Sequence, residues 1–149
     1  GHKTLAYWGR LRSLRRAAAA RAGETIWLNV SNHLASGAVS NLFLVRDGVL
    51  LTPYARGEEE EGALPAPVLP GITREAVIEL AEAAGHTVHR RMLSVQDLLE
   101  AEEAFLTNSG WQLLPVTAAE KATIGTGQPG PVGHALRAKL LETIASETA

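Results

Sequence analysis

Residues 34–52 read LASGAVSNLFLVRDGVLLT, and this stretch decides the fold. Residues 41–45 are almost continuously apolar, which is typical of a buried strand. The dipeptide Asp47-Gly48 favours a two-residue hairpin turn, because both residue types tolerate a positive φ. Residues 49–52 then return as the partner strand. The sequence therefore predicts an antiparallel hairpin here.

The segment before this hairpin predicts a helix and a strand. Residues 5–22 indicate an amphipathic helix that ends near Gly23, because apolar residues recur at three-residue spacing: Leu5, Trp8, Leu11 and Leu14. The helix also carries five arginines: Arg10, Arg12, Arg15, Arg16 and Arg21. These could form a patch for phosphate or RNA, but the net charge of −2 favours a solvated helix face. Residues 25–30 indicate a strand.

The segment after the hairpin predicts an α+β domain. Four prolines and the acidic run 58–61 lie within residues 53–71, which indicates a loop with solvated carboxylates. We expect helices over 73–84, 94–103 and 131–145, and strands over 86–92, 104–107 and 112–116. Helices and short strands alternate irregularly, so the pattern favours α+β over a doubly wound parallel sheet.

Composition excludes several classes of function. The 149 residues, 46% hydrophobic and 20% charged, suit one globular domain. The absence of cysteine excludes disulfides, thiolate metal sites and a cysteine nucleophile. No apolar run approaches the roughly 20 residues that span a bilayer. We therefore expect a cytoplasmic protein with no metal site and neither membrane nor nucleic acid as a partner.

Three glycine-centred turns are candidate binding segments, at residues 36–41, 70–73 and 107–110. The second runs into a helix, whose first N–H groups and positive dipole end suit a phosphate. A hydroxyl from a nearby turn could add a further bond. Residues 125–130 are similar to GxGxxG, but no convincing strand precedes them and Pro129 interrupts the helix start. A dinucleotide site is therefore rejected.

The order of these turns resembles the class IV (fold-type IV) family of aminotransferases, which depend on pyridoxal 5'-phosphate (PLP). That family includes branched-chain and D-amino-acid aminotransferases and aminodeoxychorismate lyases. The matching segments are KTLAY at 3–7, LASGAVSNLF at 34–43, DGVLLTP at 47–53, LPGITR at 69–74, FLTNS at 105–109, PV at 115–116 and GTGQPGP at 125–131. The resemblance implies the family's large cofactor-binding domain, a mixed sheet or pseudo-barrel with flanking helices.

The resemblance also implies residue roles. Lys3 corresponds to the lysine that forms the Schiff base with PLP and moves the proton between the substrate carbon and the cofactor. The turn that binds the cofactor phosphate corresponds to Gly71, Ile72 and Thr73, and Ser109 corresponds to a further phosphate-binding hydroxyl. Three residues correspond to positions near the substrate: Tyr7, Gly110 and Trp111. Arg74 lies in the phosphate motif, in a binding or a structural role.

Ser36 departs from the family pattern, because the family usually has a glutamate that faces the pyridine nitrogen of the cofactor. A carboxylate keeps that nitrogen protonated and makes the ring a strong electron sink. A serine can hydrogen-bond a neutral nitrogen but holds its proton less well. We therefore expect a largely neutral ring nitrogen and slow transamination.

The resemblance covers nearly the whole chain. It implies that residues 1–149 are the C-terminal PLP-binding domain of a homodimeric enzyme, and that the family's small N-terminal domain is absent from this chain. The expected function is a branched-chain-type aminotransferase acting on the amino group of an amino acid. Two alternatives stay open: a 4-amino-4-deoxychorismate lyase that releases pyruvate from an aminochorismate substrate, and a non-catalytic or incomplete domain that retains the fold.

Overall fold

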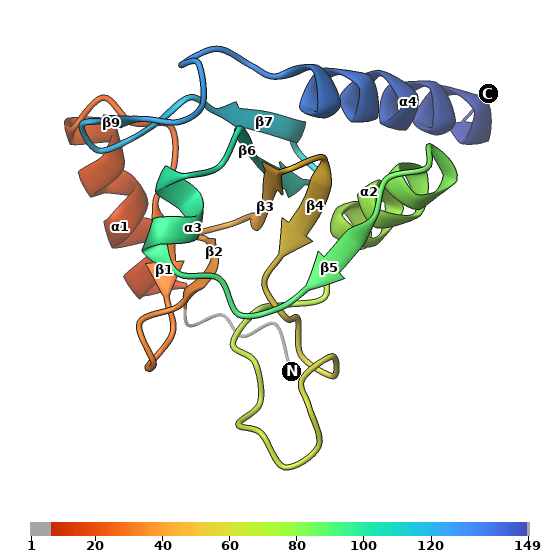
Figure 1. The fold of residues 1–149 in the computed structure, drawn as a ribbon. Helices are drawn as coiled ribbons and strands as arrows, with labels where there is room; N and C mark the ends of the chain where they lie inside the picture. Colours follow the sequence, from red (N-terminus) through yellow and green to blue (C-terminus); the bar gives the residue numbers. More distant parts are fainter. Residues whose placement is uncertain (1–6, 149) are drawn as a thin grey trace.

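The computed structural model describes residues 7–148, and a mixed seven-stranded sheet lies at their centre (Figure 1). The strands are β1 (Ile26–Leu28), β2 (Leu34–Gly37), β3 (Asn41–Arg46), β4 (Val49–Thr52), β5 (Val88–Arg90), β6 (Glu103–Asn108) and β7 (Gln112–Val116). A separate small hairpin consists of β8 (Ala118–Ala119) and β9 (Ala122–Thr123). The helices are α1 (Trp8–Ala19), α2 (Ile72–Ala83), α3 (Val95–Leu99) and α4 (Pro131–Thr148).

Strand β3 is the centre of the sheet. It pairs antiparallel with β6 from Asn41 to Val45 and with β4 from Leu44 to Arg46. The predicted hairpin is confirmed, because Asp47 and Gly48 connect β3 to β4 with φ values of 51° and 73°. Among the described strands, only β5 pairs in parallel, with β4. The α+β class and the mixed sheet with flanking helices are therefore confirmed.

Helices cover both faces of the sheet. On one face, α2 and α4 pack against apolar residues of β3, β4 and β6, where the rings of Phe43 and Phe105 stack at 5.2 Å between centroids. On the other face, Leu98 of α3 and Ile124, just after β9, pack against Leu42 and Leu106. This division follows from alternation, because neighbouring residues of a strand point to opposite faces.

Helix α1 differs from the sequence prediction in the face that it buries. Trp8 and Leu11, two of the residues used to define the apolar face, are 69% and 47% exposed. The side turned toward β1 instead carries Ser13, whose hydroxyl accepts from Trp27 Nε1 at 3.2 Å, and the buried Ala17. Ser36 and Gly37, expected to begin the turn at residues 36–41, are instead the last two residues of strand β2, which pairs with β1.

Two features do not occur within residues 7–148. No helix there is both long and apolar enough to cross a membrane. No group of three or more histidine, aspartate or glutamate side chains there is placed to hold a metal ion.

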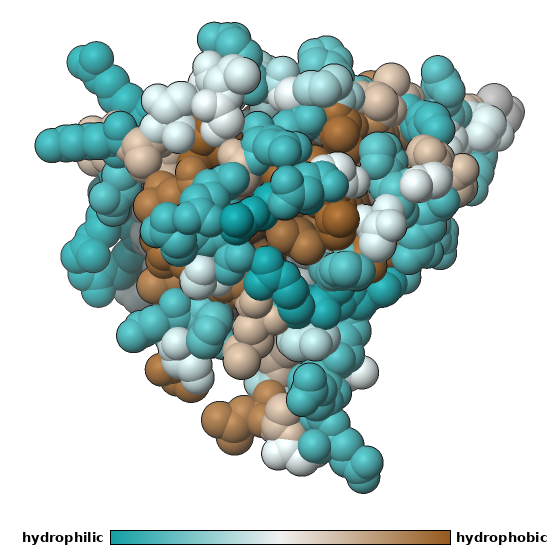
Figure 2. Space-filling model, in the orientation of Figure 1, coloured by the Kyte–Doolittle hydropathy of each residue, from teal (hydrophilic) through white to brown (hydrophobic). Residues whose placement is uncertain are grey.

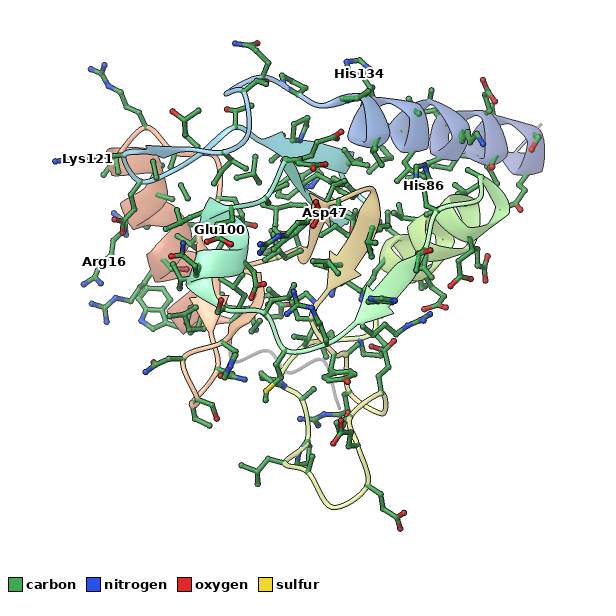
Figure 3. All side chains as sticks on the ribbon, viewed as in Figure 1. Arg16, Asp47, His86, Glu100, Lys121 and His134 are labelled. Atoms are coloured by element: carbon green, nitrogen blue, oxygen red, sulfur yellow. The ribbon has the colours of Figure 1, made fainter. Side chains whose placement is uncertain are left out.

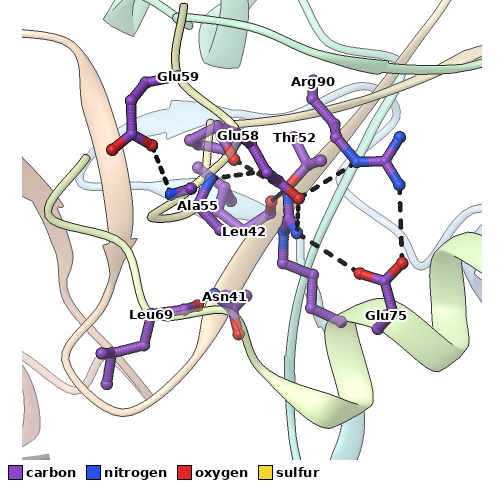
Figure 4. Close-up of polar contacts among 12 residues, drawn as sticks. Asn41, Leu42, Thr52, Ala55, Glu58, Glu59, Leu69, Glu75 and Arg90 are labelled. Atoms are coloured by element: carbon purple, nitrogen blue, oxygen red, sulfur yellow. Dashed lines mark hydrogen bonds and ion pairs between the residues drawn. The ribbon is translucent and has the colours of Figure 1, made fainter. Parts of the chain in front are cut away.

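Arg74 is a fully buried cation in the first turn of α2. Its guanidinium donates to both carboxylate oxygens of Glu58, at 2.8 and 2.7 Å, and to the Pro53 carbonyl and the Thr52 hydroxyl (Figure 4). Arg90 pairs with the same carboxylate at 3.3 Å. The acidic run is therefore not wholly solvated as predicted, because one of its members neutralises a buried charge.

The pKa of Glu58 reflects these contacts. Partial burial by itself raises the pKa, but hydrogen bonds from Arg74 and the Ala55 amide, with the charges of Arg74 and Arg90, hold it below its usual value. A carboxyl whose pKa is lowered by folding stabilises the folded state above its unfolded pKa. That contribution is lost as the pH falls through the folded pKa.

We expect Glu58→Ala to destabilise the chain by about 2–4 kcal/mol, because it leaves the buried Arg74 guanidinium without its carboxylate. Glu61→Ala is the matched control from the same acidic run; this exposed residue should cost about 0.5 kcal/mol or less. Urea unfolding followed by circular dichroism measures both values. Equal stabilities for the two variants would contradict the structural role of the pair.

Candidate functional site

Three buried polar residues lie side by side where β2, β3 and β6 meet. Ser36 is opposite Asn41 in the register, and Asn41 is opposite Thr107. Directly opposite residues project to the same face of a sheet, so the three side chains share one side. Each is 8% exposed or less. The Thr107 hydroxyl has no hydrogen-bond partner among the described residues, so it can bond to a group outside them.

The N-terminus of α2 lies against this group. Asn41 donates from Nδ2 to the Leu69 carbonyl at 2.9 Å. A Cβ atom at Gly71 would collide with the Asn41 amide oxygen, so the close approach requires glycine at this position. No side chain caps the helix at Gly71, and the first N–H groups of any helix have no partner within it. These groups, with the positive end of the helix dipole, can bind an anion.

The side chain of Ile72, the residue that follows, is 90% exposed. A binding role for this residue therefore falls to its backbone N–H. Thr73 is half-buried in the same helical turn.

The turn between β6 and β7 joins the same group of segments. The Asn108 side-chain oxygen accepts from the N–H groups of Gly110 and Trp111, at 2.9 and 3.0 Å, and so shapes the turn. Its Nδ2 donates to the Val39 carbonyl between β2 and β3 at 3.2 Å. Ser109 and Gly110 are exposed within this turn, whereas Trp111 Nε1 is buried and lacks a partner among residues 7–148.

Helix α1 supplies a cation to the turn after Ser36. Arg10 donates from Nη1 to the carbonyls of Gly37 and Ala38, at 2.8 and 3.0 Å, and to Ser36 Oγ at 3.2 Å. Its guanidinium also lies over the Trp27 ring, 5.3 Å from the centroid. The interpretation of all five arginines as a solvated face was therefore wrong for Arg10. It holds for Arg16, which points away from the molecule at the left of Figure 3.

The structure thus gathers most of the predicted site residues around the strand ends. Asn41 connects Ser36 to the turn at Gly71, Ile72 and Thr73, and Asn108 connects the turn at Ser109, Gly110 and Trp111 to the loop after β2. Tyr7 lies at the start of α1, where its carbonyl accepts from the Leu11 amide. Lys3 lies outside the described residues. Arg74 has the structural role described above, not an exposed binding role.

Three residues with these contacts had no role in the sequence analysis, namely Asn41, Thr107 and Asn108, and a fourth, Arg10, was interpreted there as part of a solvated helix face. Asn41, Thr107 and Asn108 stood within the quoted motifs, but a motif gives no side-chain direction. The helical spacing of Arg10 could have indicated that it faces the protein. Arg10 lies four residues before Leu14 and seven before the buried Ala17, so it shares their side of the helix and not that of the exposed Trp8.

Comparisons with known proteins agree with this arrangement. The family model described as "Amino-transferase class IV" matches residues 1–119. A branched-chain-amino-acid aminotransferase of Escherichia coli (strain K12) is 34% identical over 125 residues, which are 84% of this chain and 38% of that protein. A D-alanine aminotransferase of Bacillus licheniformis is 32% identical over 113 residues, 76% of this chain and 37% of that protein.

A solved structure has the same fold. The branched-chain amino acid aminotransferase from Thermobaculum terrenum, in its PLP-bound holo-form, superposes with a TM-score of 0.83 at 30% identity and covers 95% of this chain. The chain corresponds to 44% of that protein, so it spans less than half the length of these relatives. Because the family match covers most of its residues, this chain belongs to the class IV aminotransferase family.

Proposed function

We propose that this chain is the cofactor-binding domain of a PLP-dependent aminotransferase that acts on the amino group of an amino acid, of the branched-chain type. The observation that carries the proposal is the uncapped N-terminus of α2 beside a buried polar group with an unpartnered hydroxyl. The similarity to branched-chain-amino-acid aminotransferases over 84% of the chain supports the substrate class.

The described residues fit a phosphorylated cofactor. The backbone N–H groups at Gly71, Ile72 and Thr73 suit a phosphate, because a dianion is stabilised at a helix N-terminus. The exposed Ser109 hydroxyl, on the turn that Asn108 ties to the loop after β2, can donate a further bond. Ser36 and Thr107 then offer hydroxyl groups to the polar atoms of the ring.

The remaining roles concern the reacting atoms. When bound, PLP supplies an electron sink for the electrons of a bond broken at the substrate α-carbon. Lys3 would hold the cofactor and act as general base and acid toward the proton at that carbon. Gly110 and Trp111, in the turn shaped by Asn108, and Tyr7, at the start of α1, face the substrate in this proposal.

A second candidate is a lyase that releases pyruvate from 4-amino-4-deoxychorismate. The observation that favours it is the serine at position 36, because a neutral ring nitrogen withdraws fewer electrons than a protonated one. An elimination with a good leaving group depends less on that withdrawal than the two proton transfers of transamination. A domain that keeps the fold without catalysis is the third candidate.

We propose that the protein is a homodimer and that its exposed apolar side chains are covered by other parts of the assembled protein. Large apolar side chains support this, because Trp8, Leu64 and Ile72 are 69%, 79% and 90% exposed. On the face drawn in Figure 2, apolar residues lie in a band between hydrophilic ones. The cytoplasmic location and the identification of residues 1–149 as the C-terminal domain of a larger enzyme remain predictions.

We expect PLP to label Lys3. Incubation of the complete protein with PLP, borohydride reduction, digestion and mass spectrometry should place the modification on the peptide that contains Lys3. The exposed Lys121, at the turn between β8 and β9 (Figure 3), and Lys139 of α4 are the internal controls. Modification of these residues with an unlabelled Lys3 would contradict the assignment.

We expect Gly71→Ala to weaken PLP binding about tenfold to a hundredfold, which corresponds to the loss of one charge-assisted hydrogen bond of about 1.5–3 kcal/mol. The added methyl group displaces Asn41 and with it the helix start. Gly23→Ala is the matched control, because a Cβ there meets nothing within 4 Å. Fluorescence titration gives both dissociation constants, and circular dichroism checks the folding. Equal constants would argue against a phosphate at this turn.

We expect Ser36→Glu to raise transaminase activity relative to lyase activity, because a carboxylate beside the ring nitrogen favours its protonated form. Both reactions are assayed in the complete wild-type and variant proteins at equal cofactor occupancy. A ratio that stays constant or moves toward the lyase reaction would show that position 36 does not tune the ring.

A further inference from the structure

The hydrogen bond between Arg10 and Ser36 fixes the direction in which the serine hydroxyl can donate. A guanidinium carries only donors, so Ser36 Oγ must be the acceptor in the 3.2 Å contact with Arg10 Nη1. The hydroxyl hydrogen therefore remains available to another acceptor. Ser36 is 5% exposed and lies on the shared face of Asn41 and Thr107, so this donor is held inside the candidate site.

Arg10 is held firmly enough to keep this arrangement. The same nitrogen donates to two backbone carbonyls of the turn after Ser36, at Gly37 and Ala38. The Trp27 ring covers the guanidinium, and the Trp27 Nε1 in turn donates to Ser13 on the next turn of α1. The turn that carries Ser36 is thus attached to α1 through one guanidinium nitrogen, whose two hydrogens are shared among three acceptors.

The charge of Arg10 is not cancelled by an ion pair among the described residues. Glu24 is the acidic residue that faces the same turn. Its carboxylate accepts from the Ser40 hydroxyl at 3.1 Å and from the Val39 and Thr25 amides. The carboxylate therefore lies against the same turn as the guanidinium: it is bound to Val39 and Ser40, and a Cβ atom at Gly37 would meet it at 3.0 Å.

We propose that Arg10 is a positioning residue that acts through Ser36 to keep the ring nitrogen of the bound cofactor unprotonated. Arg10 donates a hydrogen bond to Ser36 Oγ. The serine hydroxyl is then left to donate its own hydrogen to the lone pair of the cofactor ring nitrogen. The guanidinium, which is always charged, then opposes a second positive charge on the ring. This inference rests on the proposed function, in which Ser36 faces that nitrogen.

Arg10 and Ser36 together have the opposite electrostatic effect on the ring nitrogen from that of a carboxylate at position 36. A carboxylate attracts a proton to the ring nitrogen, whereas a serine bound to a cation supplies the proton donor itself. The site then suits substrates whose reaction needs moderate electron withdrawal, and elimination of a good leaving group is the reaction class that meets this condition. The inference thus favours the lyase candidate.

The test measures the ring nitrogen directly. PLP labelled with ¹⁵N at the ring is bound to the complete protein, and its NMR shift is followed from about pH 5 to about pH 9. The wild type and Arg10→Lys, which keeps the charge, should show a neutral nitrogen at about pH 7. Arg10→Gln should raise the protonation midpoint by at least about one pH unit, a tenfold change in the ratio of protonated to neutral ring.

Two further variants keep the test decisive. Arg12→Gln, an exposed arginine of the same helix, should leave the titration as in the wild type. Ser36→Ala, which keeps the Arg10 contacts to the two carbonyls, should leave the nitrogen neutral and move its shift to that of a ring without a hydrogen bond. If circular dichroism shows that Arg10→Gln does not fold, Ser36→Ala tests whether the serine hydroxyl donates to the ring nitrogen.

Several results would overturn the inference: a protonated nitrogen in the wild type at about pH 7, an Arg10→Gln midpoint equal to that of the wild type, or a Ser36→Ala shift identical to the wild type. These results differ from a failure of the proposed function, in which the complete wild-type protein binds no PLP and both proposals fall together. If the protein binds PLP but the Arg10→Gln variant does not change the protonation of the ring nitrogen, only this inference is refuted.

Discussion

The buried amide of Asn41 holds the candidate site together. It donates to the Leu69 carbonyl at 2.9 Å, and its oxygen lies so close to Gly71 that no side chain fits there. Asn41 is also the residue at which β2, β3 and β6 meet in register. An amide that is 8% exposed must find partners within the protein, and this requirement places the start of α2 over the polar strand ends.

A second buried interaction supports the same helix start. Arg74 is fully buried and bound to Glu58 and to the Thr52 hydroxyl, which itself donates to the Leu42 carbonyl of β3. The helix whose first N–H groups we propose as a phosphate site is therefore attached to the central strand on two sides. Such attachment pre-organises the N–H groups, so that binding does not have to order them. A structural ion pair thus fixes the position of the helix start that we propose as the phosphate site.

The electrostatics around position 36 distinguish this chain from the pattern that its family resemblance implies. A buried serine whose hydroxyl accepts from an arginine presents a hydrogen-bond donor, where a glutamate would present an acceptor with negative charge. Donor and acceptor select opposite protonation states of a ring nitrogen. If Ser36 faces the ring nitrogen as we propose, one fold can serve reactions with different demands on the electron sink, and the residue at position 36 decides between them.

The sequence by itself determined the central hairpin, the order of most elements and the family, because local patterns carry that information. The hairpin turn requires a positive φ at two consecutive positions, which Asp47 and Gly48 tolerate. The apolar run of β3 is buried on both faces of the sheet. Only the tertiary structure decided the partners of Arg10, which are 26 to 28 residues away, and of Glu58, which is 16 residues from Arg74. Periodicity reports that a helix has a buried face and says nothing of what lies opposite. An arginine that satisfies buried carbonyls therefore looks, in the sequence, like one that faces water.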